Sequence, residues 1–123
     1  MINIRYAVLC DEARKEDNGK HFLIGVYGPD ILVPAMPTTV GIAMVLAIDT
    51  DEPWSGKVAI KVEQDNDQRF SAGGSIGLLQ SGEYLIPFPQ FPLEIKNDKD
   101  LTFSVRIEDA DWKRVRNLRI GLR

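Results

Sequence analysis

Apolar residues recur at every second position through most of this chain, and no other pattern in it constrains the fold as strongly. The amino terminus carries five of them, Ile2, Ile4, Tyr6, Val8 and Cys10. Successive side chains of a β-strand point to opposite faces, so this spacing predicts a strand with one strongly apolar face. The same period returns at residues 22–26, 57–63 and 101–107, and no segment shows a sustained helical period.

Residues 39–48 are apolar on both faces of the strand that they predict. Ile42, Met44, Leu46 and Ile48 alternate here with Ala43, Val45 and Ala47. A strand of this kind is typical of the centre of a sheet that is covered on both sides. We therefore expect this segment to be a central strand.

Turn residues and prolines divide the other segments. Asn18-Gly19 is a strong hairpin signal, and the charged residues 11–17 before it are expected to form a connector. Pro87, Pro89 and Pro92 interrupt an extended segment and place it at a sheet edge or in a crossing between sheets, because proline lacks the amide donor. The glycine-rich residues 69–80 predict either one short strand or an irregular crossing.

The last strand is expected over residues 112–122. Val115 is out of phase there with Leu118, Ile120 and Leu122, which a β-bulge would explain. The alternative for residues 111–118 is a short helix.

These segments together predict an all-β fold. Seven to nine short strands joined by Gly, Pro and Asx turns are typical of an antiparallel two-sheet sandwich of the immunoglobulin-like kind, and a small closed barrel is the alternative. The 123 residues suit one domain, residues 1–123, which buries enough surface to fold without a metal or disulfide.

Several of the motifs resemble those of a known protein family. They are the segment 18–27, with Asn18-Gly19-Lys20 and Leu23-Ile24-Gly25-Val26-Tyr27, then Leu85-Ile86-Pro87-Phe88-Pro89, and the closing hairpin 105–122. Together they resemble a family of small uncharacterised bacterial and phage β-sandwich proteins. The resemblance implies a sandwich and supplies no catalytic residues.

A single cysteine, Cys10, excludes an internal disulfide and fits a reducing compartment. The chain has no basic stretch followed by a long apolar core at its start, and no apolar run near the ~20 residues of a membrane helix. We expect a cytoplasmic protein with no membrane partner.

An enzyme needs groups that transfer protons or attack a carbon centre, and the best pair here is Cys10 with the one histidine, His21. A tight turn at Asn18-Gly19 keeps the two far apart along the hairpin. A buried structural cysteine and a surface histidine are therefore expected. We predict no enzymatic activity and no cofactor.

Four loops carry an Asp-x-Asp pair, the pattern that carboxylate sites for Ca²⁺ use. The pairs are Asp49/Asp51, Asp65/Asp67, Asp98/Asp100 and Asp109/Asp111. Because predicted strands separate them, at most two pairs share one end of a sandwich, and aspartate is also the usual turn residue. A calcium site is thus a minor alternative, and no metal ligand is assigned.

Charge is distributed unevenly along the chain. Residues 1–100 carry nine Lys/Arg and fifteen Asp/Glu (9 − 15 = −6), whereas residues 101–123 carry six and three (6 − 3 = +3). The five basic residues among the last twelve, with the two tryptophans, form the predicted interaction surface: Trp54, Trp112, Lys113, Arg114, Arg116, Arg119 and Arg123. The alternative is a solvated edge strand.

We expect the partner to be a protein, of acidic character if the arginines bind it. The pI near 5.1 and the lack of a stacking platform argue against nucleic acid. The predicted function is that of a non-catalytic protein-interaction module. One form of this prediction is a homodimer that assembles through an unpaired sheet edge. The alternatives are a sandwich that binds carbohydrate or a small ligand at Trp54 or Tyr27, and a Ca²⁺-dependent module.

Overall fold

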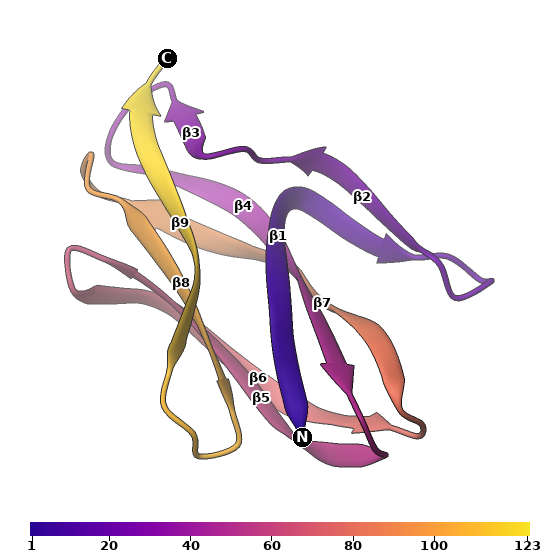
Figure 1. The fold of residues 1–123 in the computed structure, drawn as a ribbon. Helices are drawn as coiled ribbons and strands as arrows, with labels where there is room; N and C mark the ends of the chain where they lie inside the picture. The colour runs from indigo at the N-terminus through magenta and orange to yellow at the C-terminus, as the bar shows by residue number, and fades with distance from the viewer.

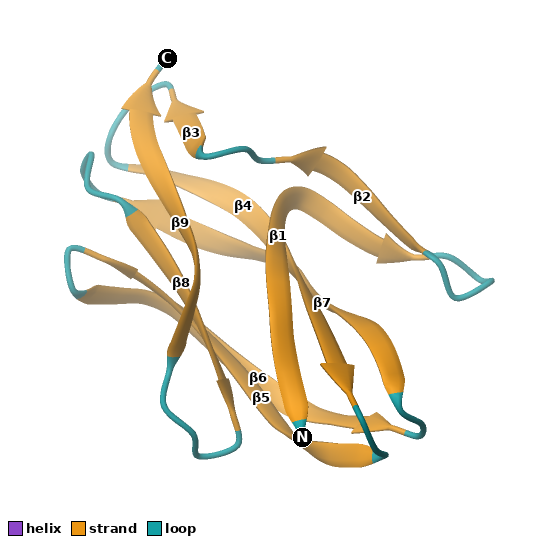
Figure 2. Cartoon of the chain, in the orientation of Figure 1, coloured by secondary structure: helices purple, strands orange, loops and turns teal.

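A computed structural model describes all residues 1–123, and it contains nine strands and no helix (Figures 1 and 2). No segment therefore forms a helix with the length and apolarity to cross a membrane. The strands are β1 (Ile2–Lys15), β2 (His21–Val26), β3 (Asp30–Val33), β4 (Thr38–Thr50), β5 (Trp54–Gln64), β6 (Asp67–Leu78), β7 (Gly82–Ile95), β8 (Leu101–Ile107) and β9 (Lys113–Leu122).

The strands form two sheets that pack face to face. The first sheet has the order β2-β1-β4-β7, and the second has the order β3-β9-β8-β5-β6. All pairs are antiparallel except β3 with β9, which is parallel. The all-β class, the strand number and the two-sheet sandwich are confirmed.

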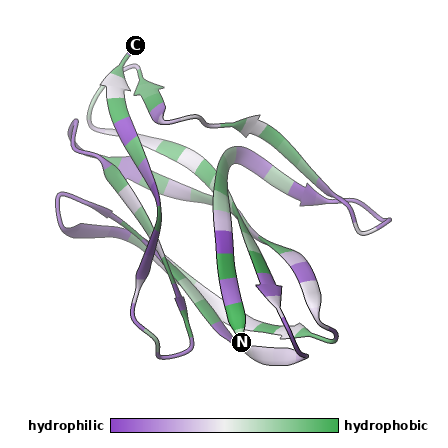
Figure 3. Ribbon diagram, in the orientation of Figure 1, coloured by the Kyte–Doolittle hydropathy of each residue, from purple (hydrophilic) through white to green (hydrophobic).

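The core lies between the inner faces of the two sheets. Nineteen buried apolar residues form it, among them Phe103, Leu46 and Ile60. Figure 3 shows the alternation as green and purple bands along the amino-terminal half of β1. Fully burying one large apolar side chain contributes about 1.5–3 kcal/mol, so this cluster supplies most of the stabilisation.

β1 departs from its predicted single apolar face. Its register with β4 shifts between Ile4 and Tyr6, where Ile4 pairs with Ile48 and Tyr6 with Ala47. This bulge adds one residue and reverses the facing of the strand. Ile2 and Ile4 therefore pack on the core, as do Ala7 and Leu9. The remaining predicted members, Tyr6, Val8 and Cys10, point to the other face.

β1 is also longer than expected, and the predicted connector at residues 11–17 is wrong. The strand continues to Lys15, which pairs with His21 of β2. These residues alternate at a sheet edge, where charged side chains reach water. Figure 1 shows β1 bending sharply from its pairing with β4 into this hairpin. Gly19 closes the hairpin with a φ of 85°, which suits a residue without Cβ.

The glycine-rich segment is neither a short strand nor an irregular crossing. β6 pairs with β5 from Asp67 to Leu78, with one register shift at Arg69. The turn before it holds Asp65 and Asn66 at φ values of 53° and 65°, the left-handed pair of a tight hairpin turn.

Two other expectations are confirmed. β7, which carries Pro87, Pro89 and Pro92, is an edge strand of the first sheet. β9 is a strand and not a helix, and its register with β8 shifts where Val115 lies unpaired between Arg114 and Arg116. The bulge turns Val115 toward the core.

Candidate functional site

The outer face of the first sheet carries apolar side chains on all four strands, with the charged Glu12 and Arg14 of β1 beside those of β2. The register places on it, from β2 to β7, the side chains of Phe22, Ile24, Val26, Tyr6, Val8, Cys10, Ala43, Val45, Ala47 and Leu85. We call this set the apolar outer face. Nine large apolar side chains of the chain are well exposed, and five of them belong to this face: Tyr6, Phe22, Ile24, Val26 and Leu85.

The floor of the apolar outer face is formed by β4. Ala43, Val45 and Ala47 are only 0%, 1% and 4% exposed, although no third layer of the chain covers them. They are small, and longer side chains of β1 and β7 stand on both sides. The face is therefore hollowed along β4.

Two polar contacts span this hollow by joining β1 to β7 across β4. At one end Gln90 Nε2 donates to the backbone carbonyl of Asp11 at 2.8 Å. Gly41 permits this crossing, because a Cβ there would lie 2.7 Å from the Gln90 side chain. At the other end the Arg5 guanidinium lies 2.5 Å from Glu83 and 3.3 Å from Asp49.

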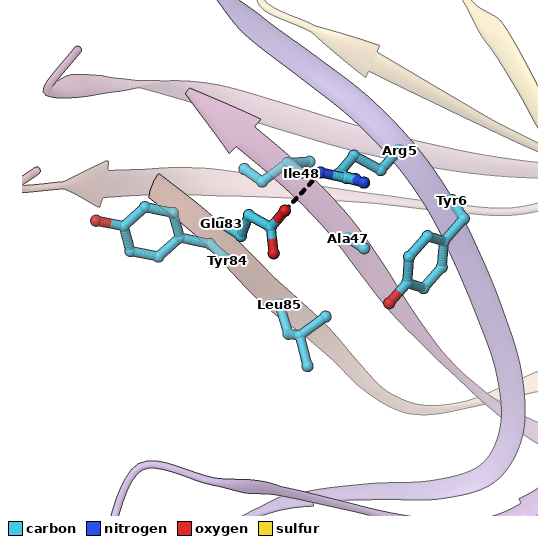
Figure 4. A pocket seen from close by; sticks show the side chains of 7 residues that line it. All are labelled: Arg5, Tyr6, Ala47, Ile48, Glu83, Tyr84 and Leu85. Carbon is cyan, nitrogen blue, oxygen red and sulfur yellow. Dashed lines mark hydrogen bonds and ion pairs between the residues drawn. The ribbon is translucent and has the colours of Figure 1, made fainter. Parts of the chain in front are cut away.

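The β1 bulge builds the second of these contacts. It projects Arg5 and Tyr6 together to the outer face, so that the ion pair and the tyrosine ring lie side by side. A hollow of about 370 Å³ lies here, and Figure 4 shows Ala47 between Tyr6 and Leu85 with the Arg5–Glu83 pair beside it. The one carboxylate that lines the hollow, Glu83, is paired with Arg5. The hollow can accept an apolar group next to a neutralised pair of charges.

The outer face of the second sheet is different in character. Its side chains are mainly polar or charged and include Lys57, Lys61, Glu63 and Arg106. Trp112 lies among them, with Lys61 Nζ 4.6 Å and Arg106 Cζ 5.5 Å from its ring centroid. Both distances fit cation–π contacts within the chain.

The structure separates the predicted basic residues from one another. Arg116 points to the other sheet and donates to the carbonyls of Ala7 at 3.4 Å and Gly28 at 2.9 Å. Arg114 lines a polar hollow on the outer face of the second sheet. Arg119 lies 3.8 Å from Asp30.

The remaining two basic residues, Lys113 and Arg123, also lie far from each other. Lys113 lines a hollow with Ile2 and Ile4 at one end of the sandwich, whereas Arg123 follows β9 at the other end. The β9 bulge therefore does not gather the basic residues into one patch.

The aromatic residues singled out in the sequence lie outside the apolar outer face. Trp54 is half-buried and packs on the core at the start of β5. Tyr27 also packs on the core, and its hydroxyl donates to Asp11 at 2.7 Å. Burial, reinforced by this bond to a carboxylate, raises the pKa of Tyr27 to about 12.

Cys10 and His21 lie far apart along the hairpin. Cys10 pairs with Val26 and Lys15 pairs with His21, so the two side chains lie five positions apart along β1. Burial raises the pKa of the Cys10 thiol, which keeps it protonated and unreactive.

The carboxylates form no group of three that could hold a metal ion. Asp49 bonds to Asn3 at 2.9 Å and pairs with Arg5, and Asp51 bonds to the amino-terminal amine at 2.6 Å. Both are thus engaged by β1 and are not directed at a shared site.

Sequence reasoning missed Tyr6, Leu85 and the Arg5–Glu83 pair as site residues. One signal in the sequence pointed to them. Residues 39–48 are apolar on both faces, so side chains of the neighbouring strands had to shield each face from water. The bulge that turns Tyr6 outward has no mark in the sequence.

Comparison with known proteins gives a family and no activity. A search of curated proteins found no match. A sequence model of DUF6941, described as a family of unknown function, matches residues 5–120 and so spans both sheets except for the start of β1 and the end of β9. The expected likeness to an uncharacterised family is confirmed, and the chain belongs to DUF6941.

Proposed function

We propose that the chain is a non-catalytic protein-interaction module that binds its partner through the apolar outer face. One observation carries the proposal. Five exposed large apolar side chains, Tyr6, Phe22, Ile24, Val26 and Leu85, lie on the outer face of a sheet whose inner face already packs on the core. Exposed apolar surface of this kind, rimmed by polar residues, is characteristic of interaction sites.

The chemistry of the face supports one kind of partner. Its charged groups are already paired within the chain, Arg5 with Glu83 and Asp49, and Arg14 with Glu12 at 2.7 Å. A docked surface therefore need not supply counter-charges. We infer an apolar, uncharged and convex partner surface that enters the hollow beside Tyr6. Burial of apolar area contributes roughly 25 cal/mol per Å², and tyrosine is a common anchor of such interfaces.

A site-specific photo-crosslinker tests this proposal. We would place p-benzoylphenylalanine at Tyr6, which is 54% exposed, and in a matched variant at the exposed Ser55 on the outer face of the second sheet. Both variants would be irradiated in cells of the source organism. We expect a discrete cross-linked protein band from position 6 and none from position 55.

The mass of the cross-linked species identifies the occupant. A species of twice the chain's mass would show self-association, and any other mass a different protein. Equal labelling from both positions would contradict a specific binding face.

A small apolar ligand is a second candidate, because the 370 Å³ hollow falls within the size range of ligand sites. A ligand that binds only the folded state raises the melting temperature in proportion to its concentration over Kd. A thermal-shift screen of small apolar compounds would reveal it. A shift that Leu85→Lys abolishes would favour this candidate over a protein partner.

A further inference from the structure

A second surface, separate from the apolar outer face, lies along β6. This strand ends the second sheet, so one side of its backbone has no strand partner. Its twelve residues include no proline, and residues 70–78 carry no charge. Long, flat and uncharged edges are templates for an added strand, and proteins usually blunt them.

The other three edges of the sandwich are blunted. β7 carries three prolines and β3 is only four residues long. β2 has only six residues, and Gly25 within it has a φ of 66°. β6 is thus the one edge in the structure that is both long and unprotected.

Beside this edge the two sheets stand apart. The rings of Phe70 and Phe91 stack with their centroids 4.1 Å apart, and this contact joins β6 to β7 at one end. Beyond that stack Gly73 and Gly74 supply no side chains, and a groove of about 310 Å³ opens between the strands. Its apolar walls are formed by Val58, Ala72, Ile76, Ile86 and Phe88.

The other side of β6 has a hollow of a different chemistry. It measures about 260 Å³ and is lined by Lys57, Ala59, Gly73 and Ser75, among others. Lys57 takes part in no ion pair within the chain, and neither hollow contains an acidic residue. The ammonium of Lys57 is therefore available to a partner.

We propose that β6 accepts an extended segment of an acidic partner protein as a sixth strand of the second sheet. Alternate side chains of an added strand point to opposite faces. On one face they are apolar and fill the groove between β6 and β7. On the other face at least one is acidic and pairs with Lys57. The occupant is thus a segment of alternating apolar and acidic residues.

A second copy of this chain does not supply that chemistry through β6. A β6 strand from another copy would bring Phe70 and Ile76 to the groove together with alanine and glycine, but its residues 70–78 carry no carboxylate for Lys57. The ammonium of Lys57 would then stay unpaired. Charge therefore favours the acidic partner.

The test uses a synthetic peptide and a matched pair of valine variants. The probe is a fluorescently labelled octapeptide of alternating valine and glutamate, titrated against the full chain and followed by anisotropy. Gly74→Val fills the groove from the core-facing side, and Gly77→Val adds the same side chain on the opposite face of β6. A Cβ at either position meets nothing within 4 Å, so both variants retain the fold.

We expect saturable binding that weakens at least about tenfold in Gly74→Val and less than twofold in Gly77→Val. Lys57→Glu should weaken binding of this peptide and strengthen binding of the matched valine–lysine peptide. Absence of saturable binding by the wild type, or equal loss in both valine variants, would overturn the proposal. A dimer that only Gly74→Val abolishes, with no peptide binding, would overturn it in favour of a second copy.

Discussion

The two outer faces of the sandwich differ in kind, although the inner faces of the same sheets build one core. On the first sheet, β4 presents Ala43, Val45 and Ala47, with exposed Tyr6 and Leu85 beside them. The second sheet presents lysines, arginines and acids around Trp112. One face is solvated as expected for a free surface, and the other resembles the inside of an interface.

This difference distinguishes two reasons why a position in the chain is apolar. Residues on the inner faces are apolar because the fold needs a core. The five exposed large side chains of the apolar outer face do not pack on that core. We infer that its apolar character serves binding.

The largest expected effect comes from a charge on the floor of the apolar outer face. Val45→Asp should lower the free energy of unfolding by about 3–5 kcal/mol, because Val45 is 1% exposed and the carboxylate would have no partner. Ser55→Asp on the opposite outer face should change it by less than about 0.5 kcal/mol. Urea unfolding measures both. Equal small changes would show that the two faces are equally solvated.

A smaller effect should separate the arginines of β9. Arg116→Ala should cost about 1–3 kcal/mol, because it removes bonds from a charged donor to Ala7 and Gly28. Arg114→Ala should cost less than about 0.5 kcal/mol, as is usual for solvated charges. Thermal and urea unfolding of the two variants would test this. A cost for Arg114→Ala that matches Arg116→Ala would contradict the assignment of Arg114 to the solvated face.

The polar contact at the end of the hollow gives a third test. Gln90→Ala should cost about 1 kcal/mol by removing the bond to Asp11, and Gly41→Ala should cost a similar amount by displacing the Gln90 side chain. The double variant should be no less stable than Gln90→Ala alone. A double-mutant cycle measures this coupling, and simple additivity of the two losses would contradict the crossing contact.

The smallest expected effect is a change in the pH dependence of stability. It comes from Tyr27, which directly follows β2, the outermost strand of the apolar outer face. The pKa of Tyr27 is about 12 in the folded state and near 10 in the unfolded state. Its stabilising contribution is therefore complete below pH 10 and is lost as pH rises toward 12. Tyr27→Phe should lose less stability than the wild type over that interval. Parallel losses in unfolding experiments at pH 9 to 12 would show that Tyr27 is not involved.

The sequence allowed much of the fold to be predicted, since alternation and prolines act locally. The core strands β4, β5 and β8, the proline-bearing edge β7 and the bulge at Val115 were all predicted. β6 was not predicted as a long strand, because Gly73 and Gly74 have low strand propensity and only pairing with β5 holds them extended.

The site was less predictable than the fold, for a reason that the β1 bulge illustrates. Tyr6 shares the period of Ile2 and Ile4, which are core residues, and one extra residue in the strand turns it outward. Arg116 was likewise assigned to a surface patch from composition, whereas its long side chain reaches the carbonyls of Ala7 in the first sheet and Gly28 between β2 and β3. Long-range register decides such placements.

Hydroxyl-radical footprinting tests the central claim, that the apolar outer face is a binding surface, most directly. It would compare oxidation of Tyr6 and Leu85 in the purified protein and in cells of the source organism, with Trp112 of the other face as the reference. We predict strong protection of Tyr6 and Leu85 in cells and no change at Trp112. Equal oxidation of Tyr6 and Leu85 in both samples would contradict the account.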